Sequence, residues 1–228
     1  MGALTKHGTG NRYIYKRFVK RPMEFLFATS ALIILSPVML IIALLVKVNL
    51  GSPVVFKQER PGLNEKIFMM YKFRTMTNDR DDNGDLLPDA KRTTKFGNFL
   101  RSTSMDELPG LWNVIRGDMA IVGPRPLLVR YLPYYTDEER TRHSVRPGIT
   151  GLAQVNGRNL LSWDQRLEMD VWYAKNVSLQ LDLKILALTI KNVVCRKGVV
   201  APGEHVMASL DVERGSKSDG TGIQIERG

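Results

Sequence analysis

The stretch STSMDELPGLWNVIRG, residues 102–117, sets two adjacent carboxylates, Asp106 and Glu107, at the start of a short apolar helix. Ser104 and Glu107 have the spacing of a capping box, which predicts a helix capped at Ser104. Pro109 fits that frame poorly because it has no N–H to donate, but it suits the first position of a helix. In either frame the carboxylates lie near unpaired backbone N–H groups, where negative charge is favourable. The pattern alone is also typical of an ordinary helix start.

The composition limits the class of protein and its partners. With 228 residues, 25% charged and 43% hydrophobic, the chain can fold a domain with an apolar core. Its formal net charge of +10 predicts anionic partners, such as phosphates, acidic lipid headgroups or nucleic acid. The single cysteine, Cys195, excludes an intrachain disulfide and a cysteine-based zinc site.

A long apolar segment follows a basic N-terminal segment, residues 1–22. Phe25–Val46 holds 22 consecutive uncharged residues, enough for a membrane helix at about 20 residues per crossing. Ser36-Pro37 at its centre predicts a kink, because the proline leaves the carbonyl of residue 33 without its helical donor. The serine hydroxyl can satisfy that carbonyl. The alternative is a long core helix of a soluble protein.

Basic residues flank this segment on both sides, so neither flank favours translocation across a membrane. The two flanks carry Lys6, Arg12, Lys16, Arg17, Lys20 and Arg21 on one side, and Lys47, Lys57, Arg60, Lys66, Lys72 and Arg74 on the other. We therefore predict that residues 23–48 enter the bilayer, bend at Ser36-Pro37 and return to the same face as a re-entrant hairpin. A straight crossing is the alternative.

Residues 49–201 form the predicted globular domain, and 202–228 a predicted loose tail. Patterns of apolar residues predict strands at 53–56, 66–76, 119–122 and 152–155, and helices at 93–100, 133–142, 162–175 and 179–195. The apolar stripe of the last helix fits either the core or a membrane surface.

Cations recur at constrained positions of this domain. Alternation along the strand 66–76 puts Lys72 and Arg74 on one face. Arg125 lies between two prolines, which stiffen it. Arg146-Pro147-Gly148 is a predicted turn whose glycine lets backbone amides approach a phosphate or nucleobase, although Pro-Gly turns are common.

Two carboxylates with nearby cations suit phosphoryl transfer. Carboxylates bind Mg²⁺ together with substrate phosphates, and cations neutralise phosphate oxygens. A carboxylate can also be the nucleophile that forms an acyl phosphate. We expect metal-assisted chemistry on an anionic substrate at a membrane face, with the cations Lys72, Arg101, Arg125 and Arg146. The alternatives are a non-enzymatic anchored module, and a phosphotransferase in which Asp106 and Glu107 only bind the metal.

Five motifs occur in order along the chain: the apolar segment broken at Ser36-Pro37, YKFRTM (71–76), RSTSMDELP (101–109), GDMAIVGPRP (117–126) and RPGITG (146–151). Together they resemble the bacterial sugar transferase family, the monotopic phosphoglycosyl transferases, over about residues 15–200. The resemblance is to the small type, which lacks the additional N-terminal membrane domain of long members.

This resemblance implies transfer of a sugar 1-phosphate from a UDP-sugar to a polyprenyl phosphate, typically undecaprenyl phosphate, with release of UMP. Such a reaction is the first membrane step of glycoconjugate or exopolysaccharide assembly. By similarity, Asp106 would be the nucleophile of a phosphosugar-enzyme intermediate, and Glu107 would assist it, with Mg²⁺ held by both. The remaining implied site residues are Lys72, Arg101 and Arg125 for phosphates, Arg146, Pro147 and Gly148 near the nucleotide, and Asp182 as a further acidic position. Asp182 also reads as an ordinary helix-start acid.

The implied fold is α/β, of a helix-rich α+β kind: a re-entrant membrane helix hairpin and one compact catalytic domain, residues 49–201, with interfacial helices. The expected location is the cytoplasmic face of the bacterial inner membrane. Expected partners are a UDP-sugar, polyprenyl phosphate and anionic membrane lipids. Nucleic acid is not expected, because no nucleic-acid-binding motif is present. The sugar, the pathway and the oligomeric state, a homodimer included, stay open.

Overall fold

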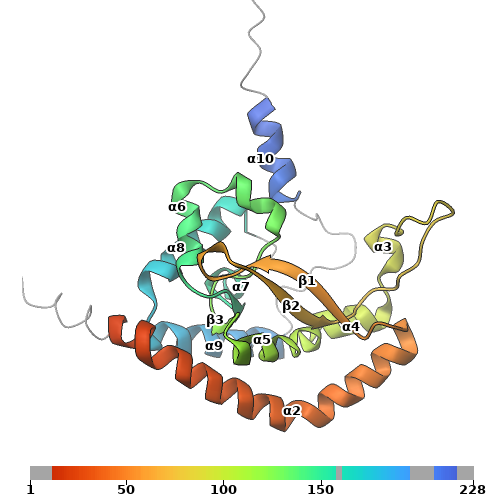
Figure 1. Cartoon of the computed structure of the whole chain (residues 1–228), viewed down its shortest axis with the longest axis horizontal. Coiled ribbons are helices and arrows are strands. Elements are labelled where there is room, and N and C mark those ends of the chain that lie inside the picture. Colours follow the sequence, from red (N-terminus) through yellow and green to blue (C-terminus); the bar gives the residue numbers. More distant parts are fainter. Residues whose placement is uncertain (1–11, 158–160, 196–207, 220–228) are drawn as a thin grey trace, which may run out of the picture.

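The structure, a computed structural model, describes residues 12–157, 161–195 and 208–219. Helices dominate it, together with two small two-stranded sheets, so the predicted helix-rich α+β class is confirmed. Figure 1 shows one long bent helix, α2 (Lys20–Leu50), running along one side of the other elements.

Helix α2 contains Pro37 and is bent, as Figure 1 shows. Pro37 cannot donate to the carbonyl of Ile33, and the Ser36 hydroxyl donates to that oxygen instead, at 2.8 Å. The predicted role of this serine is therefore confirmed. A π-helical turn, η1 (Tyr15–Val19), leads into the start of α2.

Both ends of α2 pack against the rest of the protein, whereas its middle is largely exposed. Near the start, Ala28 is fully buried in a cluster with Val114 of α5 (Gly110–Arg116). Near the end, Val46 packs with Phe73 and Leu100. The helix that includes α2 is long and apolar enough to cross a membrane, and 11% of its most apolar 18-residue window is buried. This exposure argues against a core helix, because an apolar core helix is covered on all sides. The re-entrant hairpin itself stays a prediction.

An antiparallel hairpin, β1 (Val55–Pro61) and β2 (Ile67–Phe73), forms one wall of the site described below. The first strand extends further than predicted and the second ends earlier. The register pairs Phe56 with Lys72 and Arg60 with Phe68. Directly paired residues share a face, so Arg60 and Lys72 lie on the same face of the hairpin.

Two buried polar side chains fasten this hairpin to its neighbours. Asn113 of α5 donates from Nδ2 to the Met69 carbonyl at 2.7 Å, and its Oδ1 accepts from the Tyr71 N–H at 3.1 Å. Arg74 lies just past the end of β2 and donates to the Ser52 carbonyl at 2.7 Å. Arg74 therefore joins β2 to the end of α2 and does not line the cleft with Lys72.

The second sheet pairs β3 (Ala120–Val122) in parallel with β4 (Gly148–Thr150). The predicted strand at 152–155 is wrong, because Leu152–Val155 is a short helix, α7. A four-residue apolar run does not distinguish strand from helix by periodicity. The observed strand instead uses Gly148, where a Cβ would lie 2.1 Å from the Gly123 nitrogen, so the two chains can approach this closely only without side chains.

The other helices mostly follow the prediction. They are α3 (Asp89–Arg92), α4 (Lys95–Ser102), α6 (Asp137–Arg140), α8 (Trp163–Asn176) and α9 (Leu179–Val194), with the 3₁₀ turns η2 (Leu63–Glu65), η3 (Met105–Glu107), η4 (Val129–Tyr134) and η5 (Thr141–Ser144). The predicted helix 133–142 is broken into η4, α6 and η5, because Tyr135 and Thr136 have extended backbone between η4 and α6.

Helix α9 packs one side against the core and exposes much of its apolar stripe. Asp182 and Ile185 are buried, whereas Leu183 is 56% and Ile190 66% exposed. The stripe was expected to face either the core or a membrane surface, and its exposed positions favour the membrane surface.

Part of the predicted loose tail is a docked helix, α10 (Leu210–Asp219). Leu210 is fully buried in a cluster with Tyr131 and Trp163. Arg214 forms ion pairs with Glu139 at 2.6 Å and Asp164 at 2.8 Å. The prediction is therefore wrong for this segment, and residues 202–207 and 220–228 lie outside the described residues.

Candidate functional site

The two carboxylates lie in a 3₁₀ turn, η3, immediately before α5. Ser104 has a left-handed backbone, φ 56°, and its side chain forms no cap, so the capping box predicted for Ser104 and Glu107 is wrong. Helix α5 begins at Gly110 with Pro109 at its N-cap, within one residue of the alternative frame. The chain ends α4 and reverses at Ser104, which places Asp106 and Glu107 between two helices.

Asp106 differs from the other buried carboxylates of the described residues, which are Glu24, Asp170 and Asp182. Lys20 pairs with Glu24 and Asp182, at 2.9 and 2.5 Å, and Arg142 pairs with Asp170 at 2.7 Å. The Asp106 side chain is buried with no hydrogen bond or ion pair to it among those residues. Burial, and next the neighbouring Glu107, raise the pKa of Asp106 to about 6, while Lys72, Arg125 and Arg101 oppose the rise.

The three predicted phosphate-binding cations surround this carboxylate, each close enough to lower its pKa. The Arg125 guanidinium donates from Nη2 to Glu107 Oε1 at 2.9 Å. Arg101 donates from Nε to the Thr75 hydroxyl at 2.9 Å, which orients its side chain. Burial lowers the pKa of Lys72, and Asp106 counteracts that effect. Residues from β2, α4, η3 and the segment after β3 therefore meet as the sequence predicts.

A cleft that is partly open to solvent lies beside Glu107 and is lined by Lys72, Glu107, Arg125 and Gly148. Arg60 also lines it and was not predicted. Its guanidinium donates to the Pro126 carbonyl at 3.2 Å, and its buried Nε has no hydrogen-bond partner in the described structure. Burial, and next Arg125, lower the pKa of Arg60 to about 10. Arg60 was missed because the predicted strand ends at residue 56. The observed β1 continues through Arg60 and so places its side chain on the same face of the hairpin as Lys72.

The predicted nucleotide-binding residues are divided between two places. Gly148 lines the cleft, and the Pro147 carbonyl accepts from the Ala120 N–H at 2.7 Å. Arg146 donates from Nε to the Gly117 carbonyl at 2.8 Å. Gly117 follows the last residue of α5, so Arg146 lies at the opposite end of that helix from the carboxylates, about 10 Å along a seven-residue helix.

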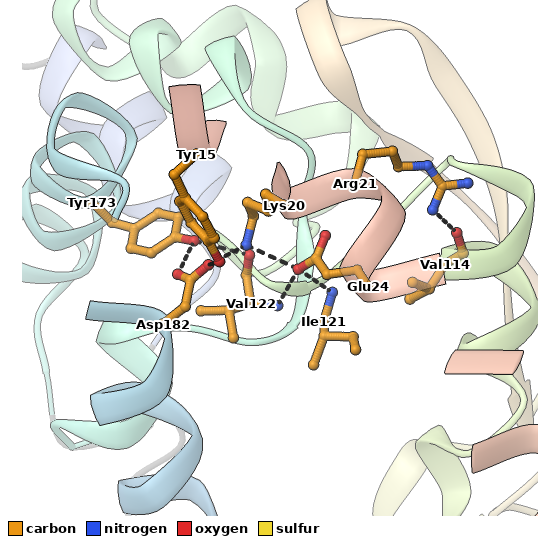
Figure 2. Close-up of polar contacts among 9 residues, drawn as sticks. All are labelled: Tyr15, Lys20, Arg21, Glu24, Val114, Ile121, Val122, Tyr173 and Asp182. Atoms are coloured by element: carbon orange, nitrogen blue, oxygen red, sulfur yellow. Dashed lines mark hydrogen bonds and ion pairs between the residues drawn. The ribbon is translucent and has the colours of Figure 1, made fainter. Parts of the chain in front are cut away.

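Asp182 lies in a separate buried network, shown in Figure 2. It accepts hydrogen bonds from the hydroxyls of Tyr15 and Tyr173, both at 2.7 Å, and pairs with Lys20 at 2.5 Å. Its carboxylate is therefore occupied by three donors, and this position is not part of the cleft lining.

The donor set fits a magnesium ion that shares its coordination with substrate. The described residues contain no cluster of three or more potential metal-binding side chains, which excludes an all-protein cage within them. Asp106 and Glu107 supply hard oxygen ligands, and Mg²⁺ is typically bound by one or two carboxylates plus substrate phosphates.

Comparison with known proteins gives a family and several relatives. The model of the bacterial sugar transferase family matches residues 15–196. An uncharacterized sugar transferase of Bacillus subtilis, EpsL, is 52% identical over 181 residues, covering 79% of this chain and 90% of that protein. A UDP-glucose:undecaprenyl-phosphate glucose-1-phosphate transferase of Klebsiella pneumoniae is 41% identical, covering 75% of this chain. An undecaprenyl-phosphate galactose phosphotransferase of Salmonella typhimurium is 39% identical, covering 80% of this chain.

The relatives differ in length. The matched region makes up 39% of the Klebsiella protein and 42% of the Salmonella protein, whereas it makes up nearly all of the Bacillus protein. The similarity therefore concerns the region that contains the two carboxylates and their cations.

Proposed function

Because the chain belongs to the bacterial sugar transferase family and is therefore a transferase, we propose that it moves a sugar 1-phosphate from a UDP-sugar to undecaprenyl phosphate or a related polyprenyl phosphate, releasing UMP. The observation that carries this proposal is the buried Asp106 carboxylate, which lacks an ion-pair partner among the described residues although three cations surround it. The names of the Klebsiella and Salmonella relatives support the choice of lipid acceptor and the donor class.

The proposed reaction has two displacements at one phosphorus atom. An Asp106 oxygen attacks the phosphorus that bears the sugar, the bond to the UMP oxygen breaks, and UMP leaves with the electron pair. A phosphate oxygen of the lipid then attacks the same phosphorus, which releases the Asp106 carboxylate and yields the lipid diphosphosugar. Lys72, Arg101 and Arg125 would neutralise the phosphate oxygens in both displacements.

The environment of Asp106 suits a nucleophile. A pKa of about 6 leaves most of this carboxylate ionised at pH 7, while making it more basic than an ordinary aspartate. Burial also limits access of water, which would otherwise compete with the lipid phosphate for the intermediate.

We propose Mg²⁺ as the cofactor, held by Asp106 and Glu107 together with the donor phosphates. When bound it would supply positive charge to the diphosphate. Glu107 can contribute an oxygen while its Oε1 remains bonded to Arg125, because a carboxylate has two oxygens.

We also propose that residues 23–48 form a re-entrant hairpin and that the domain lies on the cytoplasmic face of the inner membrane. The bend of α2, its two docked ends and its exposed middle support this topology. Basic residues near acidic lipids would contribute about 1 kcal/mol each. Lys20 and Arg21 do not count among them, because both side chains are bonded inside the protein.

Cysteine labelling in intact cells tests the topology. The exposed Cys195 is first replaced by Ser, and single cysteines then replace the exposed Tyr13 and Glu59, which lie on either side of α2. Labelling of both from the cytoplasmic side supports the hairpin. Labelling from opposite sides would establish a straight crossing.

Mass spectrometry of protein quenched after mixing with UDP-sugar alone tests the covalent step. We expect a phosphosugar adduct on Asp106, exchange of labelled UMP into the donor without lipid, and loss of turnover by several orders of magnitude in Asp106→Asn. Asp137→Asn, an exposed residue of α6, is the control. Full turnover without adduct or exchange would favour the alternative, direct attack by the lipid phosphate.

A further inference from the structure

The first turns of α2 are held in place by a buried network of charged groups, drawn in Figure 2. Lys20 Nζ bridges two carboxylates, Glu24 Oε1 at 2.9 Å and Asp182 Oδ2 at 2.5 Å, and all three residues are buried. Replacing such an ion network by apolar residues is often neutral or stabilising, so stability alone is a weak reason for it. Its contacts with backbone indicate what it does.

Glu24 is bonded directly to strand β3. Its Oε1 accepts from the N–H groups of Ile121 and Val122, at 3.0 and 3.3 Å. The Tyr173 hydroxyl lies 2.7 Å from Asp182 Oδ1 and 3.0 Å from the Val122 carbonyl, so these two acceptors share its single hydrogen. Both backbone polar groups of Val122 therefore contact this network, and Arg125 follows three residues later.

Arg21, on the same turn of α2, holds the end of α5. It donates from Nη1 to the Val114 carbonyl at 2.6 Å and from Nη2 to the Ile115 carbonyl at 2.8 Å. Carbonyls in the last turn of a helix have no partner within the helix, and a cation there is favourable. The carboxylates Asp106 and Glu107 lie just before the first turn of this same short helix.

We propose that Glu24 and Arg21 are positioning residues that set Arg125 against the carboxylate pair, so that the cleft has its working geometry only while the start of α2 is docked. Glu24 acts through β3, which precedes Arg125, and Arg21 acts through α5, which follows Glu107. The side chains of Arg125 and Glu107 are hydrogen-bonded to each other. The proposal rests on the proposed function, in which Arg125 must be aligned with the phosphate that Asp106 attacks. A misplacement of about 1 Å can cost about a hundredfold in rate.

Turnover of the full chain in lipid nanodiscs, with UDP-sugar and undecaprenyl phosphate, provides the first test. Glu24→Ala and Arg21→Gln should lower kcat about tenfold or more with little change in KM for the donor, because the alignment is lost while the cations remain. Arg21→Lys, which keeps one donor to the carbonyls, should recover part of kcat. Arg17→Gln is the matched control, because Arg17 lies one turn earlier and donates to the exposed Tyr13 hydroxyl at 2.9 Å. It should leave kcat unchanged.

Hydrogen exchange on the same proteins separates this proposal from the reaction itself, because it requires no turnover. Glu24→Ala should speed exchange in residues 121–126, and Arg21→Gln should speed exchange in residues 106–117, at temperatures where the protein stays folded. Unchanged exchange in both segments, or a fall in kcat that only follows the loss of folded protein, would overturn the proposal and leave the proposed function standing. An absence of UMP release from wild type would refute the reaction, and the exchange result would still decide the positioning role.

Discussion

Replacing Arg125 by alanine separates a role in substrate binding from a role in folding. The Arg125 side chain is 51% exposed and pairs with Glu107 at 2.9 Å. An ion pair this exposed to solvent contributes about 0 to 1 kcal/mol to stability. The Arg125 carbonyl, which accepts from Arg142 Nη2 at 2.7 Å, is kept in the variant. We therefore expect the free energy of unfolding to fall by at most about 1 kcal/mol.

The expected effect on catalysis is larger than the effect on stability. A hydrogen bond to a charged group contributes about 1.5 to 3 kcal/mol, which corresponds to a loss of about 10- to 150-fold in kcat/KM. Arg125→Lys keeps the charge but loses the planar fork that matches a phosphate, so it should recover part of the activity.

The assay is UMP release by the full chain in nanodiscs, with thermal unfolding measured on the same samples. Arg130→Ala is the matched control, because Arg130 forms a comparable ion pair with Asp211 at 3.2 Å and its side chain is 61% exposed. It should leave kcat/KM unchanged. An Arg125→Ala variant with full kcat/KM, or one that loses activity only by unfolding, would refute the reasoning.

Three further predictions concern packing and pH. Asn113→Ala leaves two backbone groups of β2 without partners, so chemical denaturation should show a loss of about 2 to 5 kcal/mol. Gly148→Ala forces a Cβ to within 2.1 Å of the Gly123 nitrogen, so thermal unfolding should shift down sharply and donor binding should weaken; Gly215→Ala, where the nearest atom is 3.9 Å away, should not reproduce this. Burial, and next Arg142, lower the pKa of His143 to about 3 in the folded state. As the pH falls, the unfolded chain therefore binds a proton at this histidine before the folded protein does. The free energy of unfolding should decrease between about pH 7 and pH 3, by up to about 1.4 kcal/mol per pH unit. His143→Gln should flatten that slope in denaturation series, and an unchanged slope would contradict it.

Two examples of one sequence motif show how far local signals predict this fold. Ser162 and Gln165 form a capping box at the start of α8, as the predicted helix at 162–175 requires. Ser104 and Glu107 have the same spacing but form none, because α4 ends only two residues earlier and the chain reverses at Ser104 with φ 56°. Local chemistry thus predicts a helix start only where the preceding chain leaves the cap residue its extended backbone.

Contacts between distant segments set the remaining features of the site. The family motifs predict Lys72, Arg101 and Arg125 as phosphate-binding cations, and the structure places all three near Asp106, while their binding of phosphate stays a prediction. It misses Arg60, whose place in the cleft depends on how far β1 extends and on the register Arg60–Phe68. Register is decided by pairing with another strand, so no pattern within residues 53–61 alone reveals it.

Asp182 and Asp106 show why acidic residues alone do not identify the chemistry. Both lie near the start of a helix, and both are buried. Tyr15, Tyr173 and Lys20 satisfy the Asp182 carboxylate, whereas no side chain of the described residues bonds to that of Asp106. Burying a carboxylate without a partner destabilises a folded protein. Such a group is expected at a site where a ligand supplies the missing partners. Asp182 therefore joins η1, α2 and α8 to α9. The carboxylate left without a partner beside three cations is the one suited to react with a phosphate.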